Sequence, residues 1–379
     1  MKLTGRTKWA IATVAIPITA FALLYVYATL PEEKEVTPPA TGEVRTIPPS
    51  WLDKARSAYY EWKTDEPIVA IIPQDKFAQV GAISPEGQYI ATGGINIRDV
   101  AISSISEKRI IRKLASDAGC VKAVAFSPDG RRLAVGRGFL PKEKLKESVH
   151  IWDMESGKLI RKLPGPMGSE MITNDADALS FSPDNRMLAV RFNQQPIGKD
   201  RVQLFDVDTG KKIRAMHPST FANGYFTFLD GGRHLGYEDE GFVIHDVRTG
   251  KRLQQFGEIG VYVLSPDGRH LAMRPDYERK LKILDRHTGQ EVKALETGKG
   301  YYRLLSYSPD GRYLAVHSDD GLLLWDLSAG RIVRKLKGHP LPVGNWMGFD
   351  AGGKYFAAAC YRYVVVWDFK KLISTEKTP

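Results

Sequence analysis

VKAVAFSPDGRRLAV (121–135) and VHIWDMESGKLIRKL (149–163) are the stretches that decide the fold, because altered copies of both recur along the chain. The first joins two apolar runs through Ser-Pro-Asp-Gly, in which Pro presets the first turn position and Gly supplies a positive φ. The second closes another hairpin at Asp-x-x-(Thr/Ser)-Gly-Lys, with Gly in the left-handed position. Each copy of the pair therefore predicts four short strands.

The turn residue of the first stretch marks the period of the repeat. It recurs at intervals of 43, 55, 47, 36, 43 and 42 residues, at Gly87, Gly130, Asn185, Gly232, Gly268, Gly311 and Gly353. The expected inner strands are apolar without strict alternation, which fits strands covered on both faces by neighbouring sheets. A repeat of about 40 residues with four strands per unit is typical of a β-propeller. Seven such units predict an all-β, seven-bladed ring.

Trp-Asp dipeptides end the third strand of three units, at Trp152-Asp153, Trp325-Asp326 and Trp367-Asp368. Together with the Ser-Pro-Asp-Gly turns, they make residues 67–379 resemble the WD-repeat propeller family. The family's Gly-His dipeptide occurs once, at Gly338-His339. No unit therefore carries the complete Asp-His-Ser-Trp hydrogen-bond tetrad of the best family members. Other units carry weakened versions of the Trp-Asp dipeptide: Ile102-Ser103, Phe205-Asp206, His245-Asp246 and Leu284-Asp285.

The seventh unit lacks a sequence for its outer strand, since the chain ends in FKKLISTEKTP (369–379) without a Thr-Gly-Lys hairpin. By contrast, PIVAIIP (67–73) is a lone apolar segment that precedes the first unit. A closed ring needs its last sheet completed, and this segment resembles the closing strand of the family. We therefore expect residues 67–73 to pair within the seventh unit.

Residues 9–30 (WAIATVAIPITAFALLYVYATL) contain no charge over 22 positions. A helix of this length spans roughly 33 Å, enough for the hydrocarbon core of a bilayer. Lys2, Arg6 and Lys8 precede the segment and acidic residues follow it. The basic flank predicts that residues 1–8 stay cytoplasmic and that the propeller lies in the periplasm or outside the cell. The alternative is secretion after cleavage near Ala28, but this apolar run is longer than that of a typical signal peptide.

Residues 31–66 link the predicted transmembrane signal-anchor to the propeller. The first part, 31–50, contains five prolines and few apolar residues, which indicates an extended spacer. The second part, 51–63, places Leu52, Ala55, Tyr59 and Trp62 at spacings of three and four, which predicts a short helix.

The formal net charge of +10 raises the question of an anionic partner. The predicted outer strands account for it, because they contain 16 Lys or Arg and two acids. We interpret these charges as a device against edge-to-edge pairing of molecules. Charges spread around a circumference do not form a nucleic-acid stripe, so we expect no nucleic-acid partner. The six outer strands are expected at 107–114, 157–163, 210–216, 250–256, 289–295 and 330–336.

Motifs for catalysis are missing from the sequence. No Gly-Lys precedes Ser or Thr, and neither His-Glu-x-x-His nor Gly-x-Ser-x-Gly occurs. Cys120 and Cys360 are too few for a thiolate zinc site, and we expect both to be free. The recurring Asp of the Trp-Asp position is expected to cap a turn. We therefore predict a non-enzyme without cofactor or metal. The lack of an Asn-x-Ser/Thr sequon in an exported chain favours a bacterial source.

Three connections around the second and third units are longer than elsewhere. From the turn residue to the Trp-Asp position there are 23 residues in the second unit and 21 in the third, against 15 in the sixth and seventh. The connection between the two units is also long. Propellers of this type bring the three together on one face, and their apolar residues with basic neighbours resemble an interface. Loops also vary neutrally. The predicted protein-binding residues are Arg137, Phe139, Leu140, Lys142, Met167, Met171, Arg191 and Phe192.

The sequence thus predicts a monomeric, membrane-tethered propeller that acts as a scaffold for an unidentified protein or peptide partner. The rival hypothesis is a propeller enzyme or small-molecule sensor with its site at the central channel. Arg191, Arg274 and His317 follow the second strand of their units and are candidates for that site. The alternative for these three residues is that they are solvated strand ends. A third possibility is an accessory domain of a peptidase or a translocation protein.

Overall fold

The computed structural model describes a defined set of residues, all of which fall within the compact unit Thr41–Pro379. The described ranges are 66–74, 77–94, 97–115, 119–138, 147–166, 173–195, 201–216, 226–257, 260–275, 280–296, 302–318, 321–336, 343–360 and 362–374. The predicted tail (1–8), anchor (9–30) and linker up to residue 65 lie outside these ranges. No helix within them is long and apolar enough to cross a membrane.

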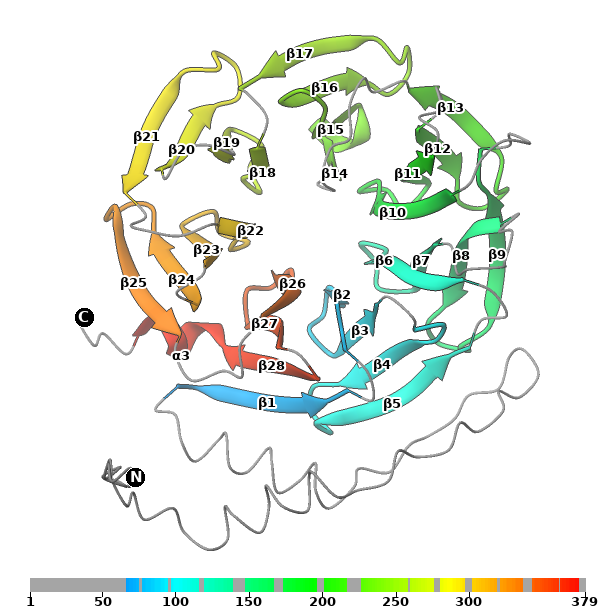
Figure 1. Cartoon of the computed structure of the whole chain (residues 1–379), viewed down its shortest axis with the longest axis horizontal. Helices are drawn as coiled ribbons and strands as arrows, with labels where there is room; N and C mark the ends of the chain where they lie inside the picture. The colour runs from blue at the N-terminus through cyan, green and yellow to red at the C-terminus, as the bar shows by residue number, and fades with distance from the viewer. Residues whose placement is uncertain are drawn as a thin grey trace, which may run out of the picture. The chain divides into compact units, whose positions relative to one another are not determined.

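Seven antiparallel sheets of four strands each are arranged as blades around a ring (Figure 1). This confirms the prediction of an all-β, seven-bladed propeller. Blade 1 contains β2 (Val80–Ile83), β3 (Tyr89–Gly93), β4 (Val100–Ser104) and β5 (Arg109–Leu114). Blade 2 contains β6 (Cys120–Phe126), β7 (Arg132–Gly138), β8 (Glu147–Asp153) and β9 (Leu159–Pro164). Blade 3 contains β10 (Thr173–Phe181), β11 (Met187–Gln195), β12 (Val202–Asp206) and β13 (Lys212–Met216).

The remaining blades repeat the same order from the inner strand to the outer strand. Blade 4 contains β14 (Phe226–Leu229), β15 (His234–Glu238), β16 (Phe242–Asp246) and β17 (Arg252–Phe256), with the 3-10 turn η1 (Asp230–Gly232). Blade 5 contains β18 (Gly260–Leu264), β19 (His270–Pro275), β20 (Lys280–Asp285) and β21 (Glu291–Glu296). Blade 6 contains β22 (Tyr302–Tyr307), β23 (Tyr313–Ser318), β24 (Gly321–Asp326) and β25 (Arg331–Leu336). Blade 7 contains β26 (Val343–Phe349), β27 (Tyr355–Cys360), β28 (Tyr363–Asp368) and β1 (Ile68–Pro73).

The ring closes as the sequence predicts, because β1 pairs antiparallel with β28. The backbone N–H of Asp368 donates to the carbonyl of Pro67 at 2.9 Å, and the indole N–H of Trp367 donates to a carboxylate oxygen of Glu66 at 2.9 Å. After β28 the chain forms the short helix α3 (Phe369–Ser374) instead of an outer strand. The start of the chain thus completes the blade that its end begins.

Apolar side chains fill the seams between neighbouring blades. Leu133 and Val135 of β7 pack with Ala91 of blade 1, whereas Ala134 packs with Leu188 of blade 3. Alternate residues of a second strand therefore contact the preceding and the following blade. A fully buried Leu or Val side chain contributes about 1.5–3 kcal/mol to the free energy of folding. Because every blade has two such faces, the ring is held mainly by apolar burial.

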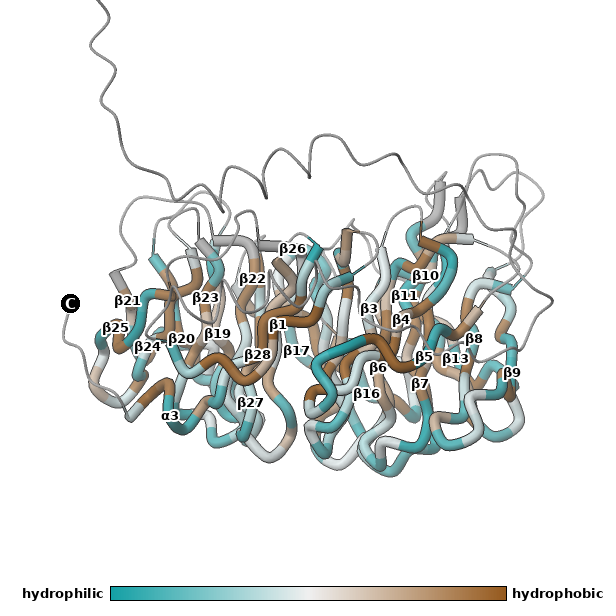
Figure 2. The backbone as a smooth tube through the Cα atoms, turned by 90° about the horizontal axis from the view of Figure 1, so that it is seen from below, coloured by the Kyte–Doolittle hydropathy of each residue, from teal (hydrophilic) through white to brown (hydrophobic). Residues whose placement is uncertain are grey.

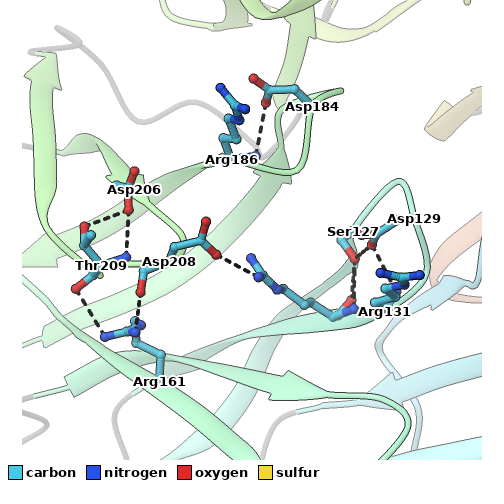
Figure 3. A network of polar contacts seen from close by, with 10 residues as sticks. Ser127, Asp129, Arg131, Arg161, Asp184, Arg186, Asp206, Asp208 and Thr209 are labelled. Carbon is cyan, nitrogen blue, oxygen red and sulfur yellow. Dashed lines mark hydrogen bonds and ion pairs between the residues drawn. The ribbon is translucent and has the colours of Figure 1, made fainter.

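The Ser-Pro-Asp-Gly turns of blades 2, 5 and 6 and the Ser-Pro-Asp-Asn turn of blade 3 form the same hydrogen bonds. In blade 2 the hydroxyl of Ser127 donates to Asp129 at 2.5 Å and accepts from the backbone N–H of Arg132 at 2.9 Å (Figure 3). The hydrogen bond from the Ser182 hydroxyl is the main reason that the pKa of Asp184 lies below its usual range. The Ser–Asp pairs of the other two blades are Ser265–Asp267 and Ser308–Asp310.

The aspartates of the Trp-Asp position cap turns, as predicted. Asp206 accepts from both the backbone N–H and the hydroxyl of Thr209 at 2.7 Å, and these bonds lower its pKa (Figure 3). Asp153 does the same with Ser156. Asp368 instead accepts from the backbone N–H of Lys371 in α3 at 3.0 Å. A carboxylate engaged in this way is structural.

Basic side chains of the outer strands join each blade to the next one. The guanidinium of Arg161 in β9 donates to the carbonyls of Asp208 and Thr209 in blade 3 (Figure 3). Arg112, Arg214, Lys293 and Arg334 occupy the same register position and reach Met154, Thr249, Leu327 and Leu372 respectively. The interpretation of the rim charges as a purely repulsive device is therefore incomplete, because these five bind the neighbouring blade.

Candidate interaction face

The two faces of the ring carry different connections. The repeated turns lie on one face, along the lower edge of Figure 2, which we call the turn face. The second strand of every blade ends at the opposite face, and the third strand begins there. We call this opposite face the variable face, because the segments that differ most in length between the units join its strand ends.

The three long connections predicted from the sequence start and end on the variable face, in neighbouring blades. They join β7 to β8, β9 to β10 and β11 to β12. Inner strands β6 and β10 of the two blades lie side by side in the ring (Figure 1). Of the predicted binding residues, Phe139, Leu140, Lys142, Met167 and Met171 lie outside the described residues. The strand ends that flank them are described, and they carry an unusual set of charged side chains.

Arg137 lies at the end of β7 and is only 1% exposed. Its guanidinium donates to the carbonyl of Arg98 at 2.6 Å and to that of Gly119 at 3.2 Å. Arg98 follows β3 of blade 1 and Gly119 precedes β6 of blade 2. The sequence placed Arg137 beside a binding loop, and the structure shows that it fixes the seam between blades 1 and 2.

Phe192 is a core residue, which corrects the prediction that it is a loop anchor for a partner. Strand β11 extends to Gln195, so Phe192 is a strand residue. Its side chain is fully buried in the cluster that includes Val149 and Leu163 of blade 2. The sequence interpretation failed because β10 and β11, each nine residues long, extend further than the repeat pattern indicates.

Asp177 is the extra residue of a β-bulge in the inner strand of blade 3. The register passes from Ala176, which faces Phe192, to Ala178, which faces Arg191. Bulges redirect a side chain and are common beside functional sites. Asp177 accepts from the Nε of Arg191 at 2.9 Å, with 22% of its side chain exposed against 8% for Arg191. The bulge thus presents a paired carboxylate beside the end of β11.

Lys122 is the equivalent bulge residue in the inner strand of blade 2. Its ammonium lies 3.2 Å from a carboxylate oxygen of Asp175 in β10, so this ion pair crosses between blades. Gly138 makes room for the pair, because a Cβ there would lie 2.4 Å from Cε of Lys122 and 3.0 Å from Cγ of Asp175. Two ion pairs therefore stand side by side at the variable face of blades 2 and 3.

Arg201 adds a buried charge to the seam between blades 3 and 4. It is 1% exposed, and burial lowers its pKa, with the positive charge of Arg191 acting in the same direction. Asp177 and Asp239 oppose this shift. Asp239, which follows β15 of blade 4, is itself 4% exposed. Buried charges are costly unless they are paired, so this seam depends on the four charges together.

Arg274 and His317, proposed from the sequence for the central channel or as solvated strand ends, are both buried. They are 9% and 8% exposed, and Arg191 is 6% exposed. The solvated alternative is therefore wrong for all three. Glu238 is the matching residue of blade 4 and accepts from the backbone N–H of Tyr262 in blade 5 at 3.2 Å. At this position blades 1 and 2 have Gly93 and Gly136.

Lys122, Asp175, Asp177, Arg201 and Asp239 were missed from the sequence. In the described part of the chain, no group of His, Cys, Asp and Glu could hold a metal ion. Neither Cys120 nor Cys360 forms a disulfide and both are buried, and burial raises the pKa of Cys360 to about 12. The described charged side chains of this face are held by ion pairs and hydrogen bonds.

Comparison with known proteins agrees with the repeat pattern. Residues 108–153 match the family model "WD domain, G-beta repeat". The chain is thus a seven-bladed β-propeller in which residues 108–153 match a WD40 repeat. A search of solved structures gives the Cps50 (Swd1) β-propeller domain of Myceliophteria thermophila, with a TM-score of 0.62 at 17% identity. That comparison covers 78% of this chain and 98% of that domain, and it shows the fold alone.

Two curated relatives share sequence with this propeller. Protein tipD of Dictyostelium discoideum is 24% identical over 272 residues, which are 67% of this chain and 40% of tipD. A guanine nucleotide-binding protein subunit beta of Saccharomyces cerevisiae is 21% identical over 273 residues, 68% of this chain and 59% of that subunit. The chain thus spans about half the length of these relatives. All three similar proteins are eukaryotic, so they do not support the prediction of a bacterial source.

Proposed function

We propose that this WD40-repeat propeller is a membrane-tethered scaffold that binds a protein partner outside the cytoplasm, and that the partner docks on the variable face of blades 2 and 3. The observation that carries the docking site is the pair of bulged inner strands, β6 and β10. They bring Lys122–Asp175 and Asp177–Arg191 together among the three connections singled out from the sequence, β7–β8, β9–β10 and β11–β12.

Two further observations support a scaffold over an enzyme. The described polar side chains of blades 2 and 3 on this face are engaged in ion pairs and backbone hydrogen bonds, an arrangement that positions a surface. One relative is by name a subunit of a guanine nucleotide-binding protein. A subunit works within an assembly, and we extend that mode of action to this chain.

The membrane tether rests on the uncharged segment 9–30 and on the basic residues that precede it. Protease added to intact cells or spheroplasts should remove the propeller while a cytoplasmic control protein survives. Protection of the propeller together with the control would show that the orientation is wrong. A mature chain that begins at Thr29 would show that the protein is secreted instead.

Affinity capture with the tagged full-length chain tests the docking site. We expect the double variant Phe139→Ser/Leu140→Ser to reduce capture of the partner at least tenfold, because both apolar residues lie in the longest connection of blade 2. The matched control is Ile160→Ser/Leu253→Ser, which changes two aliphatic side chains of the outer rim that are 45% and 50% exposed. Equal capture by both double variants would place the interface elsewhere on the ring.

A small-molecule sensor with its site at the channel is the second candidate, favoured by the buried charges Arg191, Arg201 and Asp239. A thermal-shift panel of metabolites and metal ions separates the two functions. Stabilisation by one small molecule would support the sensor. If no compound of the panel raises the melting temperature and affinity capture yields a protein partner, the scaffold function is supported.

A further inference from the structure

Blade 4 departs from the other blades where it meets its neighbours. At the register position where five outer strands carry Arg or Lys, β17 has Gln254. The seam to blade 5 is held differently, because the guanidinium of Arg286 donates to both carboxylate oxygens of Asp230 at 3.1 and 3.3 Å. His234 also contacts Asp230, with Nδ1 at 2.6 Å from the carboxylate. At the seam to blade 5, blade 4 therefore uses the titratable groups Asp230 and His234, whereas the outer strands of five other blades donate from Arg or Lys to a carbonyl.

His245 occupies the position that Trp152, Trp325 and Trp367 hold in other blades, and it is 9% exposed. Its Nδ1 lies 3.1 Å from the carbonyl oxygen of Gly250, so this nitrogen carries the proton and donates it. The other ring nitrogen, Nε2, then accepts from the hydroxyl of Tyr237 at 3.1 Å. The imidazole also stacks on the ring of Tyr237, at 5.2 Å between centroids.

The surroundings of His245 disfavour a second proton. Burial lowers its pKa, and the positive charge of Arg252 in β17 acts in the same direction, whereas the bond to Gly250 and the charge of Asp239 partly offset this. From blade 3, Arg214 of β13 donates to the carbonyls of Arg248 and Thr249, in the same turn as Gly250. A protonated imidazole would donate from both ring nitrogens, so the buried Tyr237 hydroxyl would lose its acceptor and have to accept instead of donate.

We infer that blade 4 is an acid-sensitive element of the ring, in which protonation of His245 loosens β15 and β16 while the other blades stay folded. The sign follows from linkage. His245 is neutral in the folded blade, and in the unfolded chain it takes up a proton below pH of about 6.5. Stability of blade 4 is therefore full above that pH and is lost as the pH falls below it. The carboxylate of Asp230 has a pKa below its usual range, so its ion pair with Arg286 survives this step.

The loosened strands lead to the proposed docking face. Asp239 follows β15 directly and belongs to the charge cluster with Arg201 and Asp177. Movement of β15 would separate the carboxylate of Asp239 from Arg201 and Asp177, the buried charges of blade 3. Acidification is thus expected to alter the variable face of blades 3 and 4 as well as the stability of blade 4.

Hydrogen–deuterium exchange of the full-length chain at pH 7.5 and 5.5, corrected for intrinsic exchange rates, tests the inference. In the wild type, amides of β15 and β16 should lose several-fold more protection at pH 5.5 than those of β23 and β24, up to about tenfold, which is the limit for one group with an unfolded pKa of about 6.5. His245→Phe, which installs the residue that blade 3 has at Phe205, should abolish this difference. If that variant fails to fold, His245→Trp provides the same test with the residue of blades 2, 6 and 7.

His234→Gln is the matched control, because His234 lies in the same blade but 27% of its side chain is exposed. This control should keep the acid response of β15 and β16. A uniform loss of protection over all blades in the wild type would overturn the inference. The same holds if His245→Phe keeps the response or if His234→Gln removes it.

Discussion

At the scale of single residues, glycines show how closely the blades approach each other. Gly136 of β7 lies against blade 3, and a Cβ there would be 2.1 Å from the carbonyl oxygen of Ala176. A backbone oxygen cannot move aside as a flexible side chain can. Gly348 of β26, by contrast, has only the indole nitrogen of Trp346 near the Cβ position, at 3.9 Å. The two positions differ in available space, and neither has a positive φ.

Gly136→Ala should therefore destabilise the ring by about 1–3 kcal/mol, the usual cost of overpacking. Gly348→Ala should change the free energy of unfolding by less than about 0.5 kcal/mol. Urea denaturation of both variants with the wild type measures the difference. Similar values for the two variants would mean that blades 2 and 3 can separate without cost.

The turn carboxylates give the folded chain a dependence on pH in the acidic range. Desolvation acts to raise the pKa of Asp326, but hydrogen bonds from Ser328, Ala329 and Arg312 outweigh it and bring the pKa to about 2. A depressed pKa contributes stability above the unfolded value of 3.8, and that stability is lost as the pH falls toward 2. Asp326→Asn should cost about 2 kcal/mol at pH 7. The difference from the wild type, measured by urea denaturation, should shrink between pH 4 and pH 3; a constant difference would contradict this origin.

At the scale of elements, the outer strands combine a β-bulge with a basic side chain that donates hydrogen bonds to the next blade, which we call the latch residue. In β9, Ile160 is the extra residue between Leu159, which faces Trp152, and Arg161, which faces Ile151. The bulge leaves the aliphatic side chain at the rim and turns the arginine toward blade 3. The sequence shows this as an aliphatic residue followed by Arg or Lys in LIRKL, KIRAM and EVKAL. That the Arg or Lys of this pair contacts the next blade could be inferred only from the strand register in the structure.

Arg161→Met should lower the free energy of unfolding by about 1 kcal/mol, because it keeps the apolar stem and removes the donors to Asp208 and Thr209. Lys158→Met, which changes an exposed lysine of the turn that precedes the same strand, should leave it within about 0.5 kcal/mol. Denaturant titration of the two variants shows whether Arg161 stabilises the contact between blades 2 and 3 or serves only solubility. If both substitutions lower the free energy of unfolding equally, the hydrogen bonds of Arg161 contribute no stability.

At the scale of the whole molecule, the repeat pattern predicted the number of blades, the capping aspartates and the closing strand. These features follow from local turn chemistry and from a period that the chain repeats seven times. The candidate site was predicted less well, because Phe192 is buried and Lys122 and Asp177 were missed. Bulges and ion pairs between blades arise from contacts between units, and no pattern within one unit specifies them.

Closure by β1 makes the stability of the whole ring depend on a segment from the start of the chain. A chain that lacks residues 1–64 keeps Glu66, Pro67 and β1, and should fold cooperatively. A chain that lacks residues 1–75 loses β1, so β28 becomes an edge with unpaired backbone groups and Trp367 loses its partner Glu66. The β1 side chains Ala70, Ile71 and Ile72, all at most 2% exposed, would also be lost from the apolar clusters of blade 7. We expect the longer deletion to lower the melting temperature by more than about 10 °C or to aggregate, since several buried residues are lost together. Calorimetry of the two truncated chains measures this, and equal melting temperatures would mean that the ring holds together without its closing strand.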